Sequence, residues 1–439
     1  MEIQMMGHPS MLVKTHDCRV LINPVLWNRD YEQDTPFPDV DLLVISYRYP
    51  DYLDLRNLGG FPKCIDVLIP DDDLIASRLR RLGFLRLHRL REFTEVKLGS
   101  TRICTTRSER RIPEFGVLFE EESDIFWNQI DSVVSPTTID FLVSRYSRID
   151  FLLVSQQYQP GFPYGPNRAL IFPYEEYGKL LYNVSLIRPK AIAPGANGFS
   201  SVGGSSWLSR IVFPVTREEF CRDVRLAWPE LGDNIFELDA RDSLTFGDGH
   251  IGSKIVRKTG DCLSYADFAP KLGQGLKDPD PDNESVERMM KSIIEEVEVH
   301  LPAFIDDNHS AFAEHRDWNV IYELDVVFRG GRRSWFFDFS SGVVAARRGR
   351  NPLSNFLTCI SATSFYAMLK KKHGWDYAIL EGHYRRFTKV YSVTPLGLNR
   401  PEGVRIADLL SVRFQYSPGP RPARLITLAP GLPRGMNKY

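Results

Sequence analysis

Short apolar segments, each bounded by turn-forming residues, recur along residues 1–220 and constrain the fold more than any other feature of the chain. Amphipathic segments with helical spacing lie between them and predict helices over 72–82, 137–146 and 174–187. This alternation is typical of sheets covered by outer helices, so we expect two sheets, one from each half of the region. The predicted strands are residues 2–6, 11–14, 20–22, 42–45, 66–69, 95–98, 101–105, 117–120, 125–127, 151–154 and 190–193.

The rest of the chain has a different pattern. Residues 221–284 are rich in turn signals and are predicted to form an irregular connecting region that ends in Asp278-Pro-Asp-Pro-Asp-Asn283. A helix is predicted over 284–301, a hairpin around Gly330-Gly331, a helix over 352–369, and strands near 377–380 and 390–393. We therefore expect a small α+β domain over 285–415 and a flexible, Pro- and Arg-rich tail over 416–439.

Composition narrows the class of protein. A length of 439 residues predicts more than one folded unit. Lys and Arg total 55 against 56 for Asp and Glu, so no overall field favours nucleic acid or an anionic membrane as a partner. The six cysteines lack metal-type spacing, and the chain shows neither a signal peptide nor an apolar run long enough to span a bilayer. We expect a protein of the cytoplasm.

Four stretches resemble the metallo-β-lactamase fold, in particular its UlaG-like and CMP-N-acetylneuraminate-hydroxylase-like branch. "MMGHPSMLVKTHDCRVLINPVL" (5–26) is similar to the opening of that branch, and "DVDLLVISYRYPDYLDL" (39–55) to the strand and loop that carry His-x-His-x-Asp-His. "FEEESDIFWNQIDSVVS" (119–135) resembles the segment of the bridging aspartate, and "NVSLIRPKAIAPGANGFSSVGG" (183–204) the stretch near the last metal ligand. The resemblance covers residues 1–220 and implies an α/β (α+β) fold, an αββα sandwich.

The departures from that family concern its metal site. Tyr47, Tyr49 and Tyr52 occupy the three histidine places, and only Asp51 of the motif survives. No histidine lies between His88 and His250, and neutral phenols are poor ligands for zinc or ferrous iron. We therefore expect no cofactor and no dinuclear metal site. Ferric iron accepts tyrosinate, so an iron centre built from Tyr47, Tyr49, Asp51 and Asp131 stays open as an alternative.

The tyrosine loop follows a strand and opens a helix, where polar side chains gather at the mouth of a fold. The predicted catalytic residues, which hold or protonate a substrate, are Tyr47, Tyr49, Asp51 and Tyr52. Arg48 is expected to shift the pKa of one of the phenols. In the alternative interpretation the rings only fill the space of the lost metals, and Asp51 caps the following helix. The resemblance adds Asp131 and the loop after residue 154 to the substrate site. The predicted substrate-binding residues are Arg48, Asp131, Gln156, Gln157, Tyr158 and Tyr164.

The C-terminal unit resembles a sterol-carrier-protein-like domain. The resemblance rests on "WNVIYELDVVFRGGRRSWFFDFSSGVV" and "GWDYAILEGHYRRF", and it is one of pattern. It implies a packing or dimerisation module, with an apolar ligand as the alternative. The basic run 347–350 is interpreted as a solvated turn.

The leading hypothesis is a metal-independent enzyme of a biosynthetic pathway, of lyase, cyclase or hydrolase type, acting on a small molecule in the former metal cleft. One alternative is a catalytically silent binding or scaffold protein. Another is an iron-dependent oxygenase component that takes electrons from a separate protein, because no Rieske motif is present. A carrier protein, a redox partner and a homodimer stay open, whereas nucleic acid and membrane are not expected as partners.

Overall fold

The computed structural model describes residues 1–7, 9–25, 38–50, 52–129, 131–146, 148–155, 170–195, 209–212, 214–247, 250–255, 276–279, 284–401 and 406–415. The chain divides into two compact units. The first is Met1–Gly275 together with Arg386–Val404, and the second is Leu276–Arg385 together with Arg405–Tyr439.

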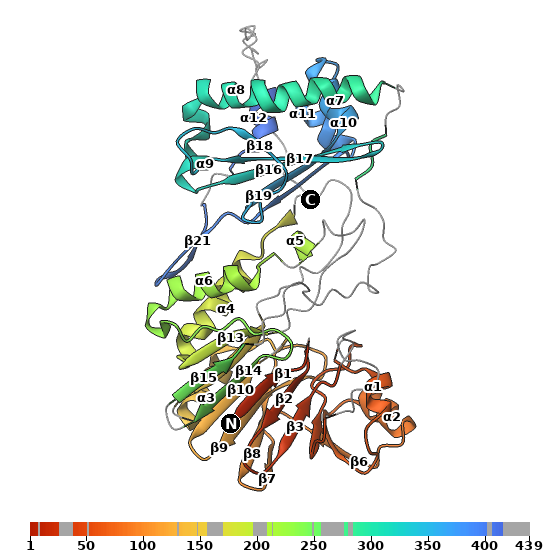
Figure 1. Cartoon of the computed structure of the whole chain (residues 1–439), viewed down its shortest axis with the longest axis vertical. Coiled ribbons are helices and arrows are strands. Elements are labelled where there is room, and N and C mark those ends of the chain that lie inside the picture. The colour runs from red at the N-terminus through yellow and green to blue at the C-terminus, as the bar shows by residue number, and fades with distance from the viewer. Residues whose placement is uncertain are drawn as a thin grey trace, which may run out of the picture. The chain divides into compact units, whose positions relative to one another are not determined.

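The first sheet of the first unit has the strand order β15-β14-β1-β2-β3-β4-β5-β6 (Figure 1). The strands from β15 to β3 pair antiparallel, and those from β3 to β6 pair parallel. The parallel strands therefore all end at one edge. Their bounds are β1 (Glu2–Met5), β2 (Met11–Lys14), β3 (Arg19–Ile22), β4 (Leu42–Val44), β5 (Asp66–Pro70), β6 (Arg86–Leu90), β14 (Ser243–Gly247) and β15 (His250–Lys254).

The second sheet has the order β13-β11-β10-β9-β8-β7. Strands β7 to β10 form an antiparallel meander, and β10, β11 and β13 are parallel. Their bounds are β7 (Glu95–Leu98), β8 (Thr101–Arg107), β9 (Phe115–Glu121), β10 (Asp124–Asn128), β11 (Phe151–Ser155) and β13 (Ala191–Gly195).

A single apolar core joins the two sheets. Val13 and Val20 of the first sheet belong to the same buried cluster as Phe119, Phe126 and Phe151 of the second. The three phenylalanine rings stack in a row, with centroids 5.9 and 5.4 Å apart. Side chains alternate between the faces of a strand, so each sheet turns one set of residues into this core and the other set outward.

Helices cover the outer faces of both sheets. Ile75 and Leu79 of α2 pack on Leu43 and Ile69 of the first sheet in a separate cluster. On the other side α3 contacts α4, and α6 contacts β13 (Figure 1). The predicted αββα layering is confirmed. The helices are α1 (Leu55–Gly59), α2 (Asp73–Arg81), α3 (Pro136–Tyr146), α4 (Tyr174–Ile187), α5 (Ser209–Val212) and α6 (Arg217–Ala227).

Two parts of the first sheet were not predicted. Strand β6 has the sequence Arg-Leu-His-Arg-Leu, and its mainly exposed side chains give little strand signal at the sheet edge. Residues of β14 and β15 were expected in an irregular region. They are strands because β14 pairs with β1, which buries Leu244 and Phe246 in the core between the sheets.

Residues 386–404 belong to the first unit although most of the second unit precedes them. They include the hairpin of β21 (Ser392–Thr394) and β22 (Gly397–Asn399). Lys389 is buried and its Nζ contacts Glu219 Oε1 on α6 at 2.5 Å. The hydroxyls of Tyr177 and Tyr391 both donate to Asp223 Oδ2, at 2.8 and 2.7 Å. These contacts fasten the segment to α4 and α6.

The second unit contains a sheet in which β19, β16, β17 and β18 are successive neighbours, and β20 lies next to β19. Helix α7, a π-helical turn at Glu296–His300 and helix α8 run along it (Figure 1). The strands are β16 (Ile321–Phe328), β17 (Gly331–Asp338), β18 (Ala346–Arg348), β19 (Phe356–Ser361) and β20 (Tyr384–Thr388). The helices are α7 (Val286–Glu295), α8 (Leu301–Asp307), α9 (Ala313–Asp317), α10 (Ala362–Leu369), α11 (Trp375–Leu380) and α12 (Leu409–Gln415).

Two predictions for this unit are wrong. The helix expected over 352–369 begins only at Ala362, because Phe356–Ser361 forms β19 and pairs with the buried strand β16. The strand expected at 377–380 is part of α11, which starts after Gly374 and buries Trp375 and Ala378. In both cases tertiary packing outweighs the local pattern.

The basic run 347–350 is exposed, as predicted, but its first two residues belong to strand β18 and not to a turn. Arg348 binds both oxygens of Glu298, with N–O distances of 2.6 and 2.9 Å. Arg350 Nη2 lies 2.9 Å from Asp325 Oδ2. The run therefore ties β18 and the residues after it to the rest of the unit.

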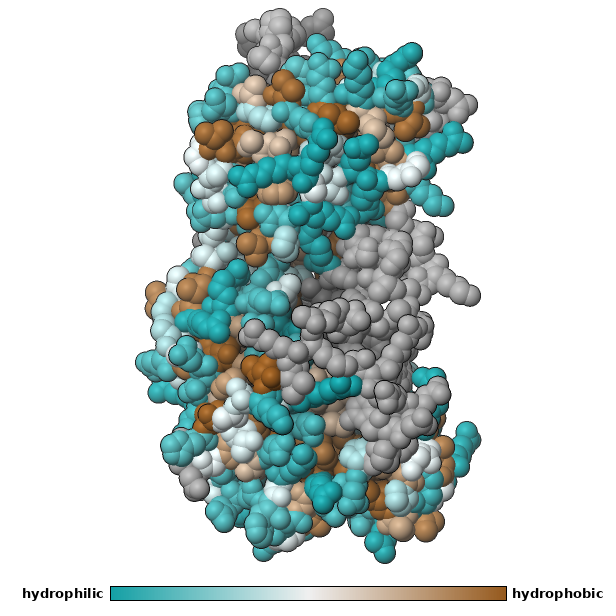
Figure 2. All heavy atoms as spheres, in the orientation of Figure 1, coloured by the Kyte–Doolittle hydropathy of each residue, from teal (hydrophilic) through white to brown (hydrophobic). Residues whose placement is uncertain are grey.

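On the face drawn in Figure 2, apolar side chains are scattered among hydrophilic ones, which is the ordinary pattern of a protein surface. Within the described residues no helix is both long and apolar enough to cross a bilayer.

Candidate functional site

Three loops meet at one edge of the sandwich and form the candidate site. The loop after β4 carries the tyrosines, the loop after β10 carries Asp131, and the connection between β8 and β9 spans residues 108–114. Phe115 N donates to Ser46 O at 3.4 Å, and Glu109 N donates to Val133 O at 2.8 Å. Strands β4 and β10 both pair parallel to a neighbour and end here, which is where ligands bind in open α/β sheets.

Asn23 fixes the start of the tyrosine loop. Its Oδ1 accepts a hydrogen bond from Ser46 N at 2.8 Å, and its Nδ2 donates to Ser46 Oγ at 2.9 Å. The residue has φ of 46°, a left-handed conformation that asparagine tolerates better than most side chains. Asn23 therefore has a structural role at a position where the resembling family has an aspartate.

The structure brings the three tyrosines together. The Tyr47 ring centroid lies 4.6 Å from that of Tyr49 and 5.7 Å from that of Tyr52, both in edge-to-face geometry. Tyr47 and Tyr52 are 2% and 1% exposed, whereas Tyr49 is 45% exposed. Burial raises the pKa of Tyr47, and its contact with Tyr49 raises it further, so Tyr47 stays a neutral phenol at ordinary pH. Tyr49 is the member of the trio that solvent reaches most readily.

Asp131 joins this cluster from the second sheet. The Tyr52 side chain is hydrogen-bonded to the Asp131 carboxylate. Burial raises the pKa of Asp131, and the positive charge of Arg110 acts in the opposite direction. Asp131 has φ of 64°, so its backbone adopts a left-handed conformation that is uncommon outside glycine. The juxtaposition of Asp131 with the tyrosines is the one that the resemblance implied.

Arg110 is the cation of the site. Its guanidinium carbon lies 5.8 Å from the Tyr47 ring centroid, and its Nε lies 3.4 Å from Glu114 Oε1. Arg110 also interacts with the charge of Asp131, and its side chain keeps a path to solvent with 37% exposure. One guanidinium is therefore close to both carboxyl groups of the site.

Glu114 is the group of this site whose pKa lies near neutral pH. Its side chain is 3% exposed, and Ser108 Oγ donates a hydrogen bond to Oε1. Glu114 Oε2 is buried and has no hydrogen-bond partner. Burial outweighs the attraction of Arg110 and raises the pKa of Glu114 to about 7. A carboxyl group in this state can both accept and donate a proton near neutral pH.

Arg48 is not part of this cluster. Its Nε and Nη2 bind Asp72 Oδ2 at 2.8 and 2.7 Å, and Asp72 Oδ1 accepts from Leu74 N at the start of α2. The cation that faces Tyr47 is Arg110, not Arg48. Arg48 therefore holds the loop against α2. The remaining predicted site residues, Asp51, Gln156, Gln157, Tyr158 and Tyr164, lie outside the described residues.

The sequence interpretation missed Arg110, Glu114 and Ser108. They lie in "SERRIPEF" (108–115), which reads as an ordinary polar hairpin connection. A usable signal was present. This connection and the loops after β4 and β10 all leave strands at one edge of the sandwich, so their polar residues could have been grouped by topology.

The resemblance implies a pair of divalent metals here, and the described side chains at this position are not a usual ligand set for them. Three phenols and a guanidinium lie beside the Asp131 carboxylate, and an arginine has no lone pair to offer a metal. Throughout the described part of the chain, no group of three or more His, Cys, Asp or Glu residues is placed to hold a metal ion.

No protein-family model matches the chain, and no curated protein is significantly similar to it in sequence. The sheet order, the shared core and the outer helices show that the first unit is a layered αββα sandwich. The branch of the metallo-β-lactamase fold and the sterol-carrier likeness of the second unit stay predictions.

Several solved structures are similar to part of this chain. The diiron β-hydroxylase CmlA from Streptomyces venezuelae is 16% identical over 56% of this chain and 54% of that chain, with a TM-score of 0.41. An isothiocyanate hydrolase from Delia radicum gut bacteria is 16% identical over 56% of this chain and 99% of that chain, with a TM-score of 0.41. YhfI from Bacillus subtilis, a metallo-β-lactamase fold protein, is 8% identical over 55% of this chain and 97% of that chain, with a TM-score of 0.39. The match spans about half of the β-hydroxylase chain.

Proposed function

We propose that the chain is a metal-independent enzyme that transfers a proton in the former metal cleft, with Glu114 as the acid or base. The observation that carries the proposal is the state of Glu114: a buried carboxyl group beside an arginine and a phenol, with one oxygen lacking a hydrogen-bond partner and a pKa of about 7. Buried, perturbed carboxyl groups of this kind cluster at active sites.

Arg110 supplies the positive charge in this proposal. A guanidinium near two carboxyl groups provides a fixed cation without any metal ligand. Negative charge that develops on a substrate oxygen during proton transfer is stabilised by such a cation. The partial exposure of Arg110 supports its contact with a bound molecule.

The tyrosines have two different tasks in the proposed site. Tyr47 and Tyr52 are buried and hold Arg110 and Asp131 in place. Tyr49 is half exposed, so its hydroxyl can reach a substrate and orient it. The proposed reaction is of the lyase, cyclase or hydrolase type on a small molecule, and the predicted role in biosynthesis belongs to the same proposal. Each of these reactions needs a proton moved at a positioned side chain.

A substrate screen on chelator-treated protein tests the proposal. Candidate metabolite pools are incubated with the wild type, Glu114→Gln and the matched control Glu122→Gln, which changes an exposed glutamate on a turn. We expect turnover by the wild type and the control, and a loss of at least about 100-fold in Glu114→Gln. Turnover that is abolished by the chelator and restored by a metal would overturn metal independence. Stoichiometric iron with a tyrosinate absorption band would instead favour the oxygenase alternative.

A further inference from the structure

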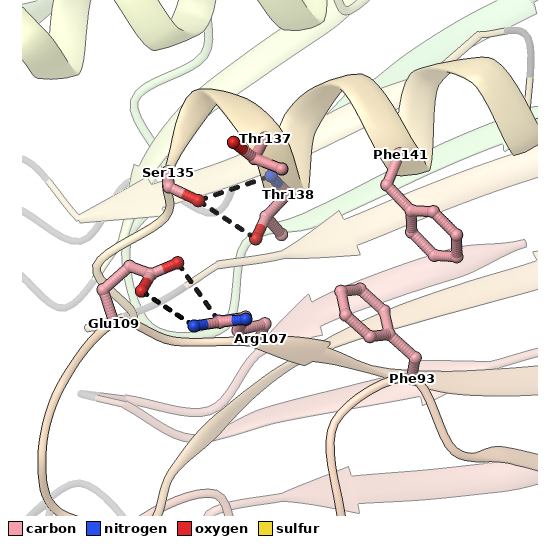
Figure 3. A pocket seen from close by; sticks show the side chains of 7 residues that line it. All are labelled: Phe93, Arg107, Glu109, Ser135, Thr137, Thr138 and Phe141. Atoms are coloured by element: carbon pink, nitrogen blue, oxygen red, sulfur yellow. Dashed lines mark hydrogen bonds and ion pairs between the residues drawn. The ribbon is translucent and has the colours of Figure 1, made fainter.

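A pocket lies beside the candidate site and is separate from it. It has a volume of about 500 Å³ and lies between α3 and the strand β8 (Figure 3). This volume is in the range of sites that bind small organic molecules. The lining residues are Phe93, Arg107, Glu109, Ser135, Thr137, Thr138 and Phe141.

The backbone of residues 107–110 lies between the pocket and the candidate site. Arg107 and Glu109 line the pocket, whereas Ser108 binds Glu114 and Arg110 lies over Tyr47. Alternate residues of an extended segment point to opposite sides, which explains this division. A ligand of the pocket therefore does not occupy the cleft of the proposed proton transfer.

One end of the pocket is aromatic. The rings of Phe93 and Phe141 are 4.7 Å apart between centroids and meet edge to face (Figure 3). Phe141 is 44% exposed, so this pair is not a buried core contact. Phe93 has φ of 58°, a left-handed conformation in which glycine is favoured and a bulky aromatic residue is an outlier. A bulky ring therefore occupies a position at which the backbone conformation favours glycine.

The other end of the pocket is lined by an ion pair. Arg107 binds both oxygens of Glu109, at 3.2 and 3.3 Å (Figure 3). Its Nε also lies 3.7 Å from Glu92, which is outside the lining. The two carboxylates and the one guanidinium together carry one net negative charge, and an ammonium group that binds Glu109 shares this carboxylate with Arg107.

We propose that this pocket binds a small molecule in which an aromatic ring carries an alkyl ammonium group. The ring packs against Phe93 and Phe141, where aromatic pairs favour edge-to-face contacts. The ammonium group binds Glu109 and compensates the excess negative charge. The same rings attract a nearby cation through their faces, so the two halves of the ligand support each other.

Binding of two probes to the full-length chain tests the proposal. Tryptamine carries the ring and the ammonium group, and indole-3-propionate carries the same ring with a carboxylate. Ligand-observed NMR titration is expected to give saturable binding of tryptamine with a Kd of about 1 mM or below and binding at least about tenfold weaker for indole-3-propionate. Equal affinities for the two probes, or no saturation by tryptamine, would overturn the proposal.

Three variants locate the binding. Phe93→Gly removes the ring and suits the left-handed backbone, so the fold is retained and thermal melting verifies it. Glu109→Gln removes the charge at nearly constant shape. Each is expected to weaken tryptamine binding by at least about fivefold, whereas Tyr182→Ala, which removes an exposed ring on α4 outside the pocket, leaves it unchanged. Unchanged affinity in both Phe93→Gly and Glu109→Gln would show that tryptamine binds elsewhere and would refute the assignment.

Discussion

Ser108 donates its hydroxyl hydrogen to one oxygen of Glu114, while the other oxygen of the same carboxyl group is buried without a hydrogen-bond partner. This asymmetry is unusual, because buried polar atoms are nearly always paired. It leaves one side of the carboxyl group available for an exchangeable proton or for a ligand atom.

The first prediction concerns stability as a function of pH. Burial raises the pKa of Glu114 to about 7, from about 4.3 in an unfolded chain. The folded state therefore holds the proton more tightly, and this contribution is fully present below pH 4 and is lost as the pH rises to 7. Between pH 5 and pH 8 the free energy of unfolding of the wild type should fall relative to that of Glu114→Gln by about 2 kcal/mol. Denaturant titrations at both pH values measure this difference, and parallel curves would contradict it.

The second prediction concerns Arg110. Its positive charge lowers the pKa of Glu114 against the effect of burial. Arg110→Gln should therefore move the Glu114 titration upward, and it should abolish any turnover that the wild type shows. The exposed neighbour Arg111 provides the control, because Arg111→Gln should leave the titration near pH 7. Carbon-detected NMR of labelled glutamate, assigned with Glu114→Gln, gives the pKa of Glu114 in both arginine variants.

The third prediction separates the tyrosines. Tyr52→Phe removes the hydrogen bond that the buried Tyr52 makes with Asp131 and should lower the free energy of unfolding by about 1–3 kcal/mol. Tyr49→Phe removes a hydrogen bond with Tyr47, but at a half-exposed side chain that water reaches, so it should alter stability by less than about 1 kcal/mol. If Tyr49 contacts substrate, its variant should instead reduce turnover by about tenfold or more. Full activity in Tyr49→Phe would count heavily against a substrate role for this residue.

The fourth prediction concerns His315 of the second unit. The ring packs between Phe312 and Phe339, its Nε2 lies 3.0 Å from Ala407 O, and burial lowers the pKa of His315 to about 4. The folded state disfavours the charged ring, so its contribution to stability is present above pH 6.5 and is lost as the pH falls toward 4. The free energy of unfolding of the wild type is expected to fall by about 3 kcal/mol relative to that of His315→Gln. Proton NMR of the ring should show no protonation at pH 5.5.

The fifth prediction concerns the segment 386–404. Lys389→Met combined with Tyr391→Phe leaves Glu219 and Asp223 on α6 without these partners. Removal of one member of a buried ion pair typically costs about 3–5 kcal/mol, so the first unit should unfold at a lower temperature. Lys97→Met, which changes an exposed lysine of β7, is the control. Equal melting temperatures for the two variants would contradict the packing of this segment.

The layered fold could be predicted because its strands and helices carry clear apolar periodicity. Strands β6 and β14 could not, since β6 is a charged edge strand and β14 is defined by its pairing with β1. Strand β19 could not be predicted either. Its sequence pattern indicates a helix, but the segment is a strand because it pairs with β16.

The candidate site was predicted in part. The juxtaposition of Tyr47, Tyr49, Tyr52 and Asp131 follows from the resemblance. Glu114 and Arg110 escaped prediction because a glutamate and an arginine in a hairpin connection are usually solvated. Only the approach of three loops shows that Glu114 is buried.

The interleaving of the two units along the chain has a practical consequence for anyone who wants to dissect them. Residues 276–385 interrupt one unit, and residues 386–404 return to it before the chain leaves again. No single cut site yields two intact halves. A stand-alone version of the first unit has to carry residues 386–404 on the same polypeptide as residues 1–275, so that the hairpin Ser392–Asn399 is supplied.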